Sequence, residues 1–496
     1  MERLNSKSCR YQRAAILAGI MALAFGVRII GIGRESLWLD EGVSAVRAFQ
    51  DTVRIWQSTT HGDYNPPGYY YALHYWIMLA GREEGPMRLL SAILSTLSVW
   101  LVYRIGKELM PRSAAIFAAL LTTLSVYHLR YAQELRPYAL FGFTVLLSLL
   151  FLLKLCRRYR GMTAAGYLLS TAATLYSHPY AIFQWLAQNL FFVLGRLFYR
   201  DFVRIRRRQW ILLQGLIVLL FSPWLWAMLH IVRHIENTRP IQWVPRWVDL
   251  PGAFKAFAGD NAAGGLLLII LILMSVLLTP ATFKKPNAGN AIFSFRKPSG
   301  REMFLWLWLL CPILIPYLMS HYSAPIFQSR YMIAASFACY LLAAAGIMRI
   351  RPVLLKGAAA TAIITLFLFT LIPYYSQTHK EQWRDAASYI EQQAKPGDLL
   401  LFNSGYCQSC VYWYYAKRMD LPIKGFPVQG DPRVVTEADV RRQFPSLIDD
   451  HNHIWLILSH SFDREGIILR YLTEQYDIRD RKIFNGIEIY GLEKRL

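Results

Sequence analysis

The chain has 496 residues, of which 55% are hydrophobic and 14% aromatic, and its formal net charge is +22. This composition excludes an ordinary soluble protein, and the length exceeds that of one domain. Lysine and arginine are concentrated in clusters between long apolar segments, as in the cytoplasmic loops of membrane proteins. The positive charge therefore indicates membrane orientation, and we expect no nucleic acid as a partner.

The first apolar segment, residues 14–32, is expected to be an uncleaved membrane span because it is long and lacks a clear cleavage site. An outer segment, residues 33–87, follows it. If residues 39–51 are helical, they divide into an apolar face of Leu39, Val43 and Val46 and a polar face of Asp40, Ser44, Arg47 and Asp51. This pattern predicts an amphipathic helix in the membrane surface that carries two adjacent carboxylates, Asp40 and Glu41. An interfacial helix whose charges only face water would show the same pattern.

Ten further apolar segments lie between residues 88 and 373. The basic clusters at 157–160, 204–208 and 284–285 all fall on the same side of the alternating count. The positive-inside rule then predicts a cytoplasmic N-terminus and an extracytoplasmic C-terminus in a plasma or inner membrane. We therefore predict an α-helical polytopic membrane protein, with about eleven transmembrane helices in residues 1–375.

The sequence becomes polar after residue 375. Three segments have helical patterns, at 383–393, 437–450 and 465–476, and three have strand patterns, at 398–402, 453–458 and 482–492. Alternating helices and strands predict a small extracytoplasmic α/β domain over residues 376–496.

Two of the six cysteines, Cys407 and Cys410, lie in this outer domain, where disulfides persist. Their spacing favours a local disulfide, and packed free thiols are the main alternative. Redox or zinc chemistry would also use such a pair, and zinc would need two further ligands, for which His451 and His453 are candidates.

Polar side chains gather on the predicted outer face, and this arrangement suits transfer of a group from a lipid-linked phosphate. Carboxylates such as Asp40, Glu41 and Glu134 can act as a general base, and arginines can hold a phosphate with a planar donor fork. The arginines and the other polar candidates on this face are Arg88, Arg136, Arg330 and His178. Membrane anchoring explains Arg88 equally well, and a helix-end contact explains His178.

Five motifs together carry a resemblance to a known family. They are Leu37-Trp38-Leu39-Asp40-Glu41, Asn65-Pro66-Pro67, Arg88-Leu89-Leu90-Ser91-Ala92, Gln133-Glu134-Leu135-Arg136-Pro137-Tyr138 and Arg330-Tyr331. Over residues 10–375 the chain resembles the membrane glycosyltransferases of the GT-C superfamily, in particular the protein O-mannosyltransferase and aminoarabinose transferase branch.

The resemblance implies a polyprenyl-phosphate-sugar donor and inversion at the anomeric carbon. It implies that Asp40 is the catalytic base, that Glu41 and Glu134 are supporting acids, and that Arg136 and Arg330 hold the donor phosphate. Asn65 stands where such enzymes often have histidine or lysine, so a substrate contact known there is expected to be absent or supplied elsewhere. Some superfamily members need a divalent metal, but this branch generally does not, and we favour none.

Two other functions are consistent with many membrane spans. A transporter or flippase for lipid-linked sugars would place charges near the middle of its spans, which are almost free of them here. A non-catalytic membrane scaffold or sensor would leave the paired acids unexplained. For the transferase, the sequence leaves open whether the acceptor hydroxyl belongs to a glycolipid, a glycan or a protein, and whether the sugar is a hexose, a uronic acid or an amino-pentose.

Overall fold

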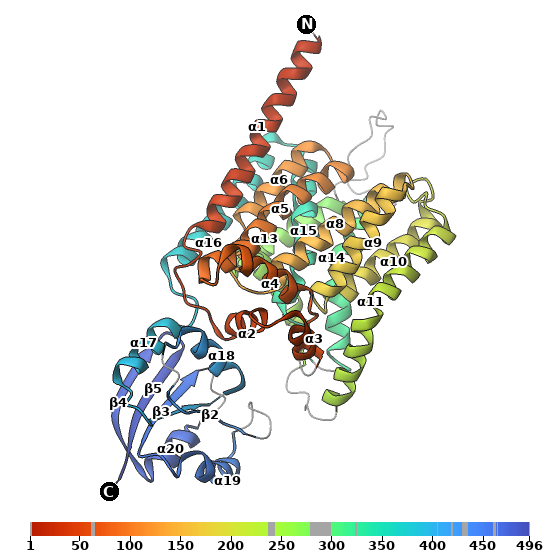
Figure 1. Ribbon diagram of the computed structural model, residues 1–496. Coiled ribbons are helices and arrows are strands. Elements are labelled where there is room, and N and C mark those ends of the chain that lie inside the picture. Colours follow the sequence, from red (N-terminus) through yellow and green to blue (C-terminus); the bar gives the residue numbers. More distant parts are fainter. Residues whose placement is uncertain are drawn as a thin grey trace. The chain divides into compact units, whose positions relative to one another are not determined.

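The computed structural model describes residues 2–60, 65–236, 244–277, 299–322, 325–403, 405–417, 420–428, 435–459, 463 and 465–495. The chain divides into two compact units (Figure 1). The helical unit comprises residues 1–30, 52–75 and 88–376, and the α/β unit comprises residues 31–51, 76–87 and 377–496. Residues 31–51 and 76–87, which the sequence assigned to the membrane domain, are thus in one compact unit with the C-terminal segment.

Helices make up the regular structure of the described part of the helical unit. They are α1 (Glu2–Ile29), α3 (Thr52–Thr60), α4 (Gly68–Ala80), α5 (Glu84–Leu109), α6 (Arg112–Leu124), α7 (Val126–Ala132), α8 (Tyr138–Arg157), α9 (Gly161–Ser177), α10 (Ala181–Phe198), α11 (Arg207–Glu236), η1 (Trp247–Asp249), α12 (Leu250–Phe257), α13 (Ala262–Leu277), α14 (Gly300–Met319), η2 (Ser329–Met332), α15 (Ile333–Arg349) and α16 (Val353–Ser376). Helices α4 and α5 each begin or end in the α/β unit.

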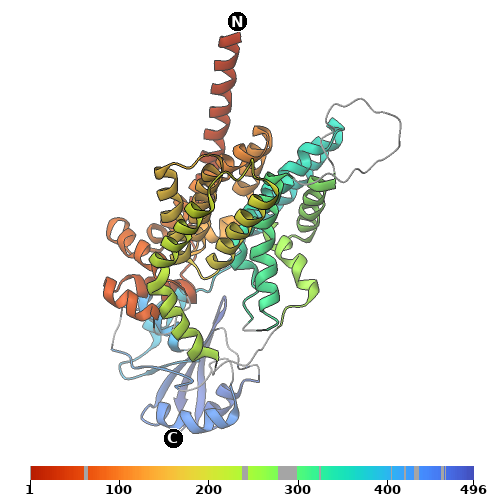
Figure 2. The same cartoon turned by 90° about the vertical axis from the view of Figure 1, so that its right-hand side faces the viewer.

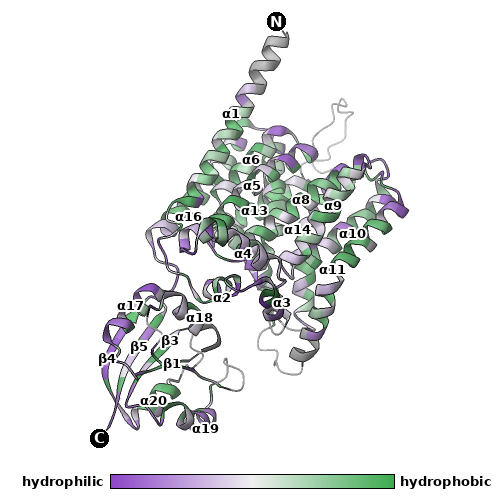
Figure 3. Cartoon of the chain, in the orientation of Figure 1, coloured by the Kyte–Doolittle hydropathy of each residue, from purple (hydrophilic) through white to green (hydrophobic). Residues whose placement is uncertain are grey.

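Seven helices in the described residues are long and apolar enough to cross a membrane. The number is nine if each of two bent pairs, α6 with α7 (58°) and η1–α12 with α13 (97°), counts as one span. The chain is therefore a multi-pass integral membrane protein, and Figure 3 shows hydrophobic residues along helices such as α13. Helices occupy all eleven expected positions. The apolar part of α1 (Ala14–Ile29) and the 17-residue helix α9 are, however, shorter than the seven helices that are long enough to cross a membrane. A total of eleven spans is therefore not established.

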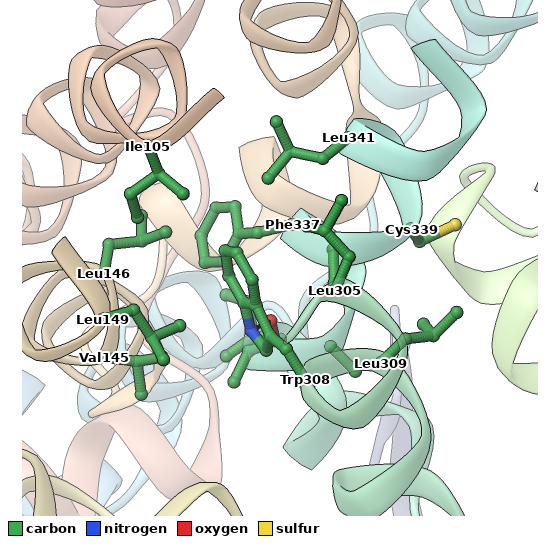
Figure 4. Close-up of a cluster of buried hydrophobic side chains, with 14 of the residues drawn as sticks. Ile105, Val145, Leu146, Leu149, Leu305, Trp308, Leu309, Phe337, Cys339 and Leu341 are labelled. Atoms are coloured by element: carbon green, nitrogen blue, oxygen red, sulfur yellow. Dashed lines mark hydrogen bonds between the residues drawn. The ribbon is translucent and has the colours of Figure 1, made fainter. Parts of the chain in front are cut away.

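Helix α15 lies in the core of the helical unit, where α6, α8, α13, α14 and α16 pack around it. Figure 4 shows Phe337 of α15 and Trp308 of α14 among leucine, isoleucine and valine side chains. The Trp308 indole nitrogen donates to the carbonyl of Ala334 at 2.7 Å. At Gly346, a Cβ would lie 1.9 Å from the carbonyl oxygen of Leu271, so only glycine allows α13 and α15 to approach this closely. Figures 1 and 2 show α8, α9, α10 and α11 side by side at the edge of this core.

The α/β unit is built on a five-stranded sheet with strand order β2-β1-β3-β5-β4. Its strands are β1 (Leu399–Phe402), β2 (Ile423–Gly425), β3 (His453–Ser459), β4 (Tyr476–Phe484) and β5 (Ile487–Lys494), and its helices are α2 (Leu39–Ala48), α17 (Trp383–Gln393), α18 (Gly405–Tyr415), α19 (Glu437–Ile448) and α20 (Ile467–Thr473). Strand β1 pairs in parallel with β2 and β3, and β5 pairs antiparallel with β3 and β4.

Both faces of β1 are buried, as expected for a strand covered on both sides. Leu399 and Leu401 belong to a core shared with α19 and α20, whereas Phe402 contacts Trp383 of α17 and Tyr412 of α18. The predicted α/β architecture is confirmed.

Four features of the α/β unit differ from the prediction. Helix α18 and strand β2 were not predicted. The strand predicted at 482–492 is the end of β4, a turn at Asn485-Gly486 and most of β5, because Gly486 adopts a φ of 73° and reverses the chain. The helix predicted at 465–476 is shorter, Ile467–Thr473, because β4 already begins at Tyr476.

Candidate functional site

The two adjacent carboxylates lie in the first turn of α2, within the α/β unit. The backbone N–H of Trp38 donates to Oε2 of Glu41 at 3.4 Å, which satisfies one of the donors left open at a helix start. Acidic side chains are favourable at this position because the helix dipole is positive there. Asp40 is half-buried, whereas Glu41 is fully buried.

The expected faces and end of α2 require correction. The helix ends at Ala48, so Asp51 lies beyond it, and the buried side contains Glu41, Gly42, Ser44, Ala45 and Ala48. Val43 and Val46, expected on the apolar face with Leu39, are half-buried, whereas Leu39 is buried. The small residues Gly42 and Ala45 turn inward because this side packs closely against α18.

Glu41 forms an ion pair with a lysine far away in the sequence. The Lys380 Nζ lies 3.0 Å from Oε2 of Glu41, and the exposed fractions of the two side chains are 11% and 0%. A buried carboxylate is stable only when it is paired and hydrogen-bonded. Lys380 therefore compensates the charge of Glu41, whereas the half-buried Asp40 remains the more accessible carboxylate of the pair.

The chain entering α2 is fixed by a second set of contacts in the α/β unit. The Tyr415 hydroxyl accepts a hydrogen bond from the backbone N–H of Leu37 at 2.6 Å and donates to Oε1 of Glu84 at 2.9 Å. Burial, followed by the charge of Glu84, raises the pKa of Tyr415 above its ordinary value, so the hydroxyl keeps its proton and can donate. Arg384 donates to the same carboxylate oxygen through Nε at 3.1 Å and Nη2 at 2.7 Å.

In the helical unit, Gln133 fixes the start of the Gln-Glu-Leu-Arg-Pro-Tyr motif. Its Nε2 donates to the carbonyl oxygens of Arg28 at 3.0 Å and Ile30 at 2.8 Å, and its Oε1 accepts from the Tyr374 hydroxyl at 2.8 Å. Glu134 and Arg136, which follow in the same motif, are 7% and 9% exposed. The motif is therefore held by the ends of α1 and α16.

Arg136 and Arg330 both lie against one aromatic cluster of the helical unit. The guanidinium carbon of Arg136 is 6.0 Å from the ring centroid of Tyr138, and that of Arg330 is 5.1 Å from the ring of Tyr331. The two tyrosine rings are 6.3 Å apart, and His178 lies 5.6 Å from Tyr138 and 5.2 Å from Tyr331. The structure thus brings together three of the predicted binding residues, which come from positions far apart in the sequence.

This cluster places two guanidinium groups beside tyrosine rings and an imidazole, an arrangement that can hold an anion. The Nδ1 atom of His178 accepts from the backbone N–H of Tyr180 at 3.1 Å, so the proton of a neutral ring is on Nε2. Arg330 donates through Nε to Oε1 of Gln328 at 2.8 Å and through Nη2 to the Tyr331 hydroxyl at 3.2 Å. These two neutral acceptors orient the guanidinium group of Arg330.

For the two remaining predicted residues, Arg88 and Asn65, the structure gives the position and the burial. Arg88 is buried on α5 with 1% exposure, which differs from a side chain that extends to the membrane surface. Asn65 is half-buried in the bend before α4, and the double proline does precede a new helix as predicted.

Sequence reasoning missed Lys380, Gln133 and Arg28. Gln133 lies within a motif that was recognised, and a charged residue at the end of an apolar segment, such as Arg28, could have been flagged. Lys380 has no local signal, since 339 positions separate it from Glu41.

Cofactor and cysteine chemistry gain no new support. Among the described residues no three His, Cys, Asp or Glu side chains gather as a metal site, and this includes His451 and His453. Cys410 is half-buried on α18, and burial raises the pKa of its thiol against the opposing charge of Arg47. The side chain of Cys407 lies outside the described residues, so the disulfide stays a prediction.

Comparison with known structures identifies the fold. ArnT from Cupriavidus metallidurans in the apo state matches over 96% of this chain and 98% of its own, with a TM-score of 0.62 and 12% identity. The chain has the fold of the GT-C membrane glycosyltransferases. This confirms the resemblance inferred from the sequence.

Further comparisons agree with the GT-C fold. The ArnT structure bound to undecaprenyl phosphate matches over 96% of this chain and 97% of that chain, with a TM-score of 0.59 and 12% identity. The archaeal oligosaccharyltransferase AglB from Archaeoglobus fulgidus, in complex with an inhibitory peptide and a dolichol-phosphate, gives a TM-score of 0.53 at 12% identity over 97% of this chain and 74% of that chain. The family model of dolichyl-phosphate-mannose-protein mannosyltransferases matches residues 64–227, about a third of the chain. No curated protein sequence is similar enough to match.

Proposed function

We propose that this GT-C protein transfers a sugar from a polyprenyl-phosphate donor to a hydroxyl acceptor, with inversion at the anomeric carbon. The observation that carries the proposal is the acid pair on α2, in which Glu41 is neutralised by Lys380 and Asp40 is the accessible carboxylate. The match along nearly the whole chain to a structure bound to undecaprenyl phosphate supports this class of donor. A glycolipid, a glycan or a protein would supply the hydroxyl.

The reaction is a single displacement. The acceptor oxygen forms a bond to the anomeric carbon while the bond from that carbon to the phosphate oxygen breaks and leaves its electron pair on the phosphate. Asp40 takes the acceptor proton as general base. The polyprenyl phosphate leaves as a stable anion, so positive charge from Arg136 and Arg330 suffices and no strong general acid is needed.

We propose supporting roles for the other predicted residues. Glu41 and Glu134 are buried carboxylates that support the reacting groups, and His178 contributes the wall of the aromatic cluster beside the arginines. We propose no step through a metal, since one base with positive charge on the leaving group accounts for the displacement.

The test is Asp40→Asn, which keeps the size of the side chain but cannot accept a proton. Purified protein would be incubated with undecaprenyl phosphate carrying a hexose, a uronic acid or an amino-pentose, together with glycolipid, oligosaccharide and peptide acceptors. Release of undecaprenyl phosphate should fall by about 10²–10⁴-fold in Asp40→Asn. Donor binding and the thermal unfolding midpoint should stay at parental values.

Asp51→Asn is the matched control, because it removes the same charge from an exposed position just beyond α2. Glu41→Gln should lower the release of undecaprenyl phosphate by a smaller factor than Asp40→Asn. Normal turnover by Asp40→Asn with inactive Glu134→Gln would show that the base is assigned to the wrong carboxylate. A parental protein that consumes none of the donors would contradict the proposed function.

A further inference from the structure

Segment 379–382, which connects the last helix of the helical unit to α17, is held in place from two directions within the α/β unit. From the chain before α2, Oε1 of Glu35 accepts the backbone N–H groups of His379 at 2.5 Å and Lys380 at 3.3 Å. The hydroxyl of Ser36 donates to the carbonyl of Glu381. The backbone of Lys380 is therefore tied directly to the residues that lead into α2.

From the opposite direction, the turn between β4 and β5 holds the same segment. The Asn485 Nδ2 donates to the carbonyl of Lys380 at 2.9 Å. The backbone N–H of Gln382 donates to the carbonyl of Asn485 at 3.1 Å, and the N–H of Asn485 donates back to Oε1 of Gln382 at 2.8 Å. The turn between β4 and β5 thus fixes the backbone position of Lys380.

A lysine is ordinarily a flexible point charge on a four-carbon stem. Here its backbone is fixed at both carbonyl and amide, its side chain is 11% exposed, and its ammonium group meets a carboxylate that is fully buried. When one charge of such a buried pair is removed, the other cannot reach water and is left without compensation. The two side chains therefore hold each other in place.

We propose that Lys380 is a positioning residue for sugar transfer, which holds Glu41 and the first turn of α2 so that Asp40 is kept in place to receive the acceptor proton. This inference rests on the proposed function. Asp40 and Glu41 are consecutive in one helical turn, so a displacement of the buried carboxylate also moves the base. Lys380 also separates the roles of the two acids, since Glu41 is engaged with it while Asp40 is only half-buried.

The experiment compares Lys380→Met, which keeps the length of the stem without the charge, with Lys380→Arg, which keeps the charge. With the undecaprenyl-phosphate sugar that the parental protein consumes fastest, Lys380→Met should lower kcat by about 10- to 100-fold, as expected for a misplaced catalytic group. The donor KM should change by less than about twofold, because uniform substrate binding is not touched. Lys380→Arg should recover most of the lost kcat.

Two further variants separate positioning from general stability. In Glu41→Gln combined with Lys380→Met, neither buried charge remains, so kcat should be no lower than in Lys380→Met alone. Arg441→Met is the control, since it breaks an exposed ion pair with Glu437 and Glu474 in the same unit and should leave kcat unchanged.

The outcomes are distinct. Lys380→Met with parental kcat and a lowered unfolding midpoint would overturn the inference, because the lysine would then serve stability alone. Equal losses in kcat for Lys380→Met and Lys380→Arg, or strictly additive losses in the double variant, would also overturn it. An inactive parental protein would instead overturn the proposed function, and with it the inference that rests on it.

Discussion

Replacing Gly42 by alanine should disable transfer while leaving the protein folded. A Cβ at Gly42 would lie 2.5 Å from the Cβ and 2.7 Å from the Cα of Val411 on α18. Carbon atoms pack at about 3.5–4.0 Å, so α2 and α18 must separate by about 1 Å. Such overpacking costs about 1–3 kcal/mol, and the better helix propensity of alanine offsets about 1 kcal/mol of this. The net loss of stability is small, but Asp40, the proposed base on α2, moves.

A displacement of about 1 Å in a catalytic group can lower the rate by about 10²-fold. We therefore expect Gly42→Ala to release undecaprenyl phosphate about 10²-fold more slowly, with a thermal midpoint within a few degrees of the parent. Gly215→Ala on α11 is the matched control, because a Cβ there meets no atom within 4 Å. Parental turnover by a folded Gly42→Ala protein would refute the argument that packing of α2 on α18 fixes the position of Asp40.

Two further predictions concern the arginines and the orientation of the chain. Arg136→Lys and Arg330→Lys keep the charge but lose the planar fork, and the loss of a charge-assisted hydrogen bond of about 1.5 kcal/mol should slow transfer at least about tenfold. Arg246→Lys is the control, because the side chain of Arg246 is 79% exposed. Parental transfer rates in both Arg136→Lys and Arg330→Lys would show that these two arginines only anchor the protein at the membrane interface. A reporter fused after Leu496 should read extracytoplasmic, since the basic clusters are predicted inside. A cytoplasmic reading would contradict the predicted topology.

The helices of the membrane unit could be located from the sequence because long apolar runs leave few other possibilities in a bilayer. The α/β unit was harder. Its parallel strands β1 and β3 were found as buried apolar runs, but the hairpin of β4 and β5 was read as one strand. Asn485-Gly486 is a strong hairpin signal, and the prediction did not use it.

The site could be predicted only where its chemistry is local in sequence. Asp40 and Glu41 stand next to each other, so their presence on one helix start was found. The partner of Glu41 was not, because Lys380 comes from a linker whose composition indicates no function. Likewise, the meeting of Arg136 and Arg330 depends on aromatic packing between segments almost 200 residues apart. Such contacts are fixed by the tertiary fold, which the local pattern does not encode.

Arg28 bears on the choice between a transferase and a transporter. A transporter is expected to carry charges near the middle of its spans, and Arg28 is a fully buried charge in the last turn of α1. However, its three nitrogen atoms donate to Ser95 Oγ at 2.8 Å and to the carbonyls of Ala24 at 2.9 Å and Thr122 at 3.2 Å. A translocating arginine must exchange its partners for substrate, whereas this one is bound to the backbone of two helices. The backbone carbonyl of Arg28 accepts a hydrogen bond from the side chain of Gln133, which directly precedes Glu134. Arg28 thus supports the Gln-Glu-Leu-Arg-Pro-Tyr motif, which also contains Arg136. This arrangement agrees better with the proposed transferase than with a mobile charge on a transport path.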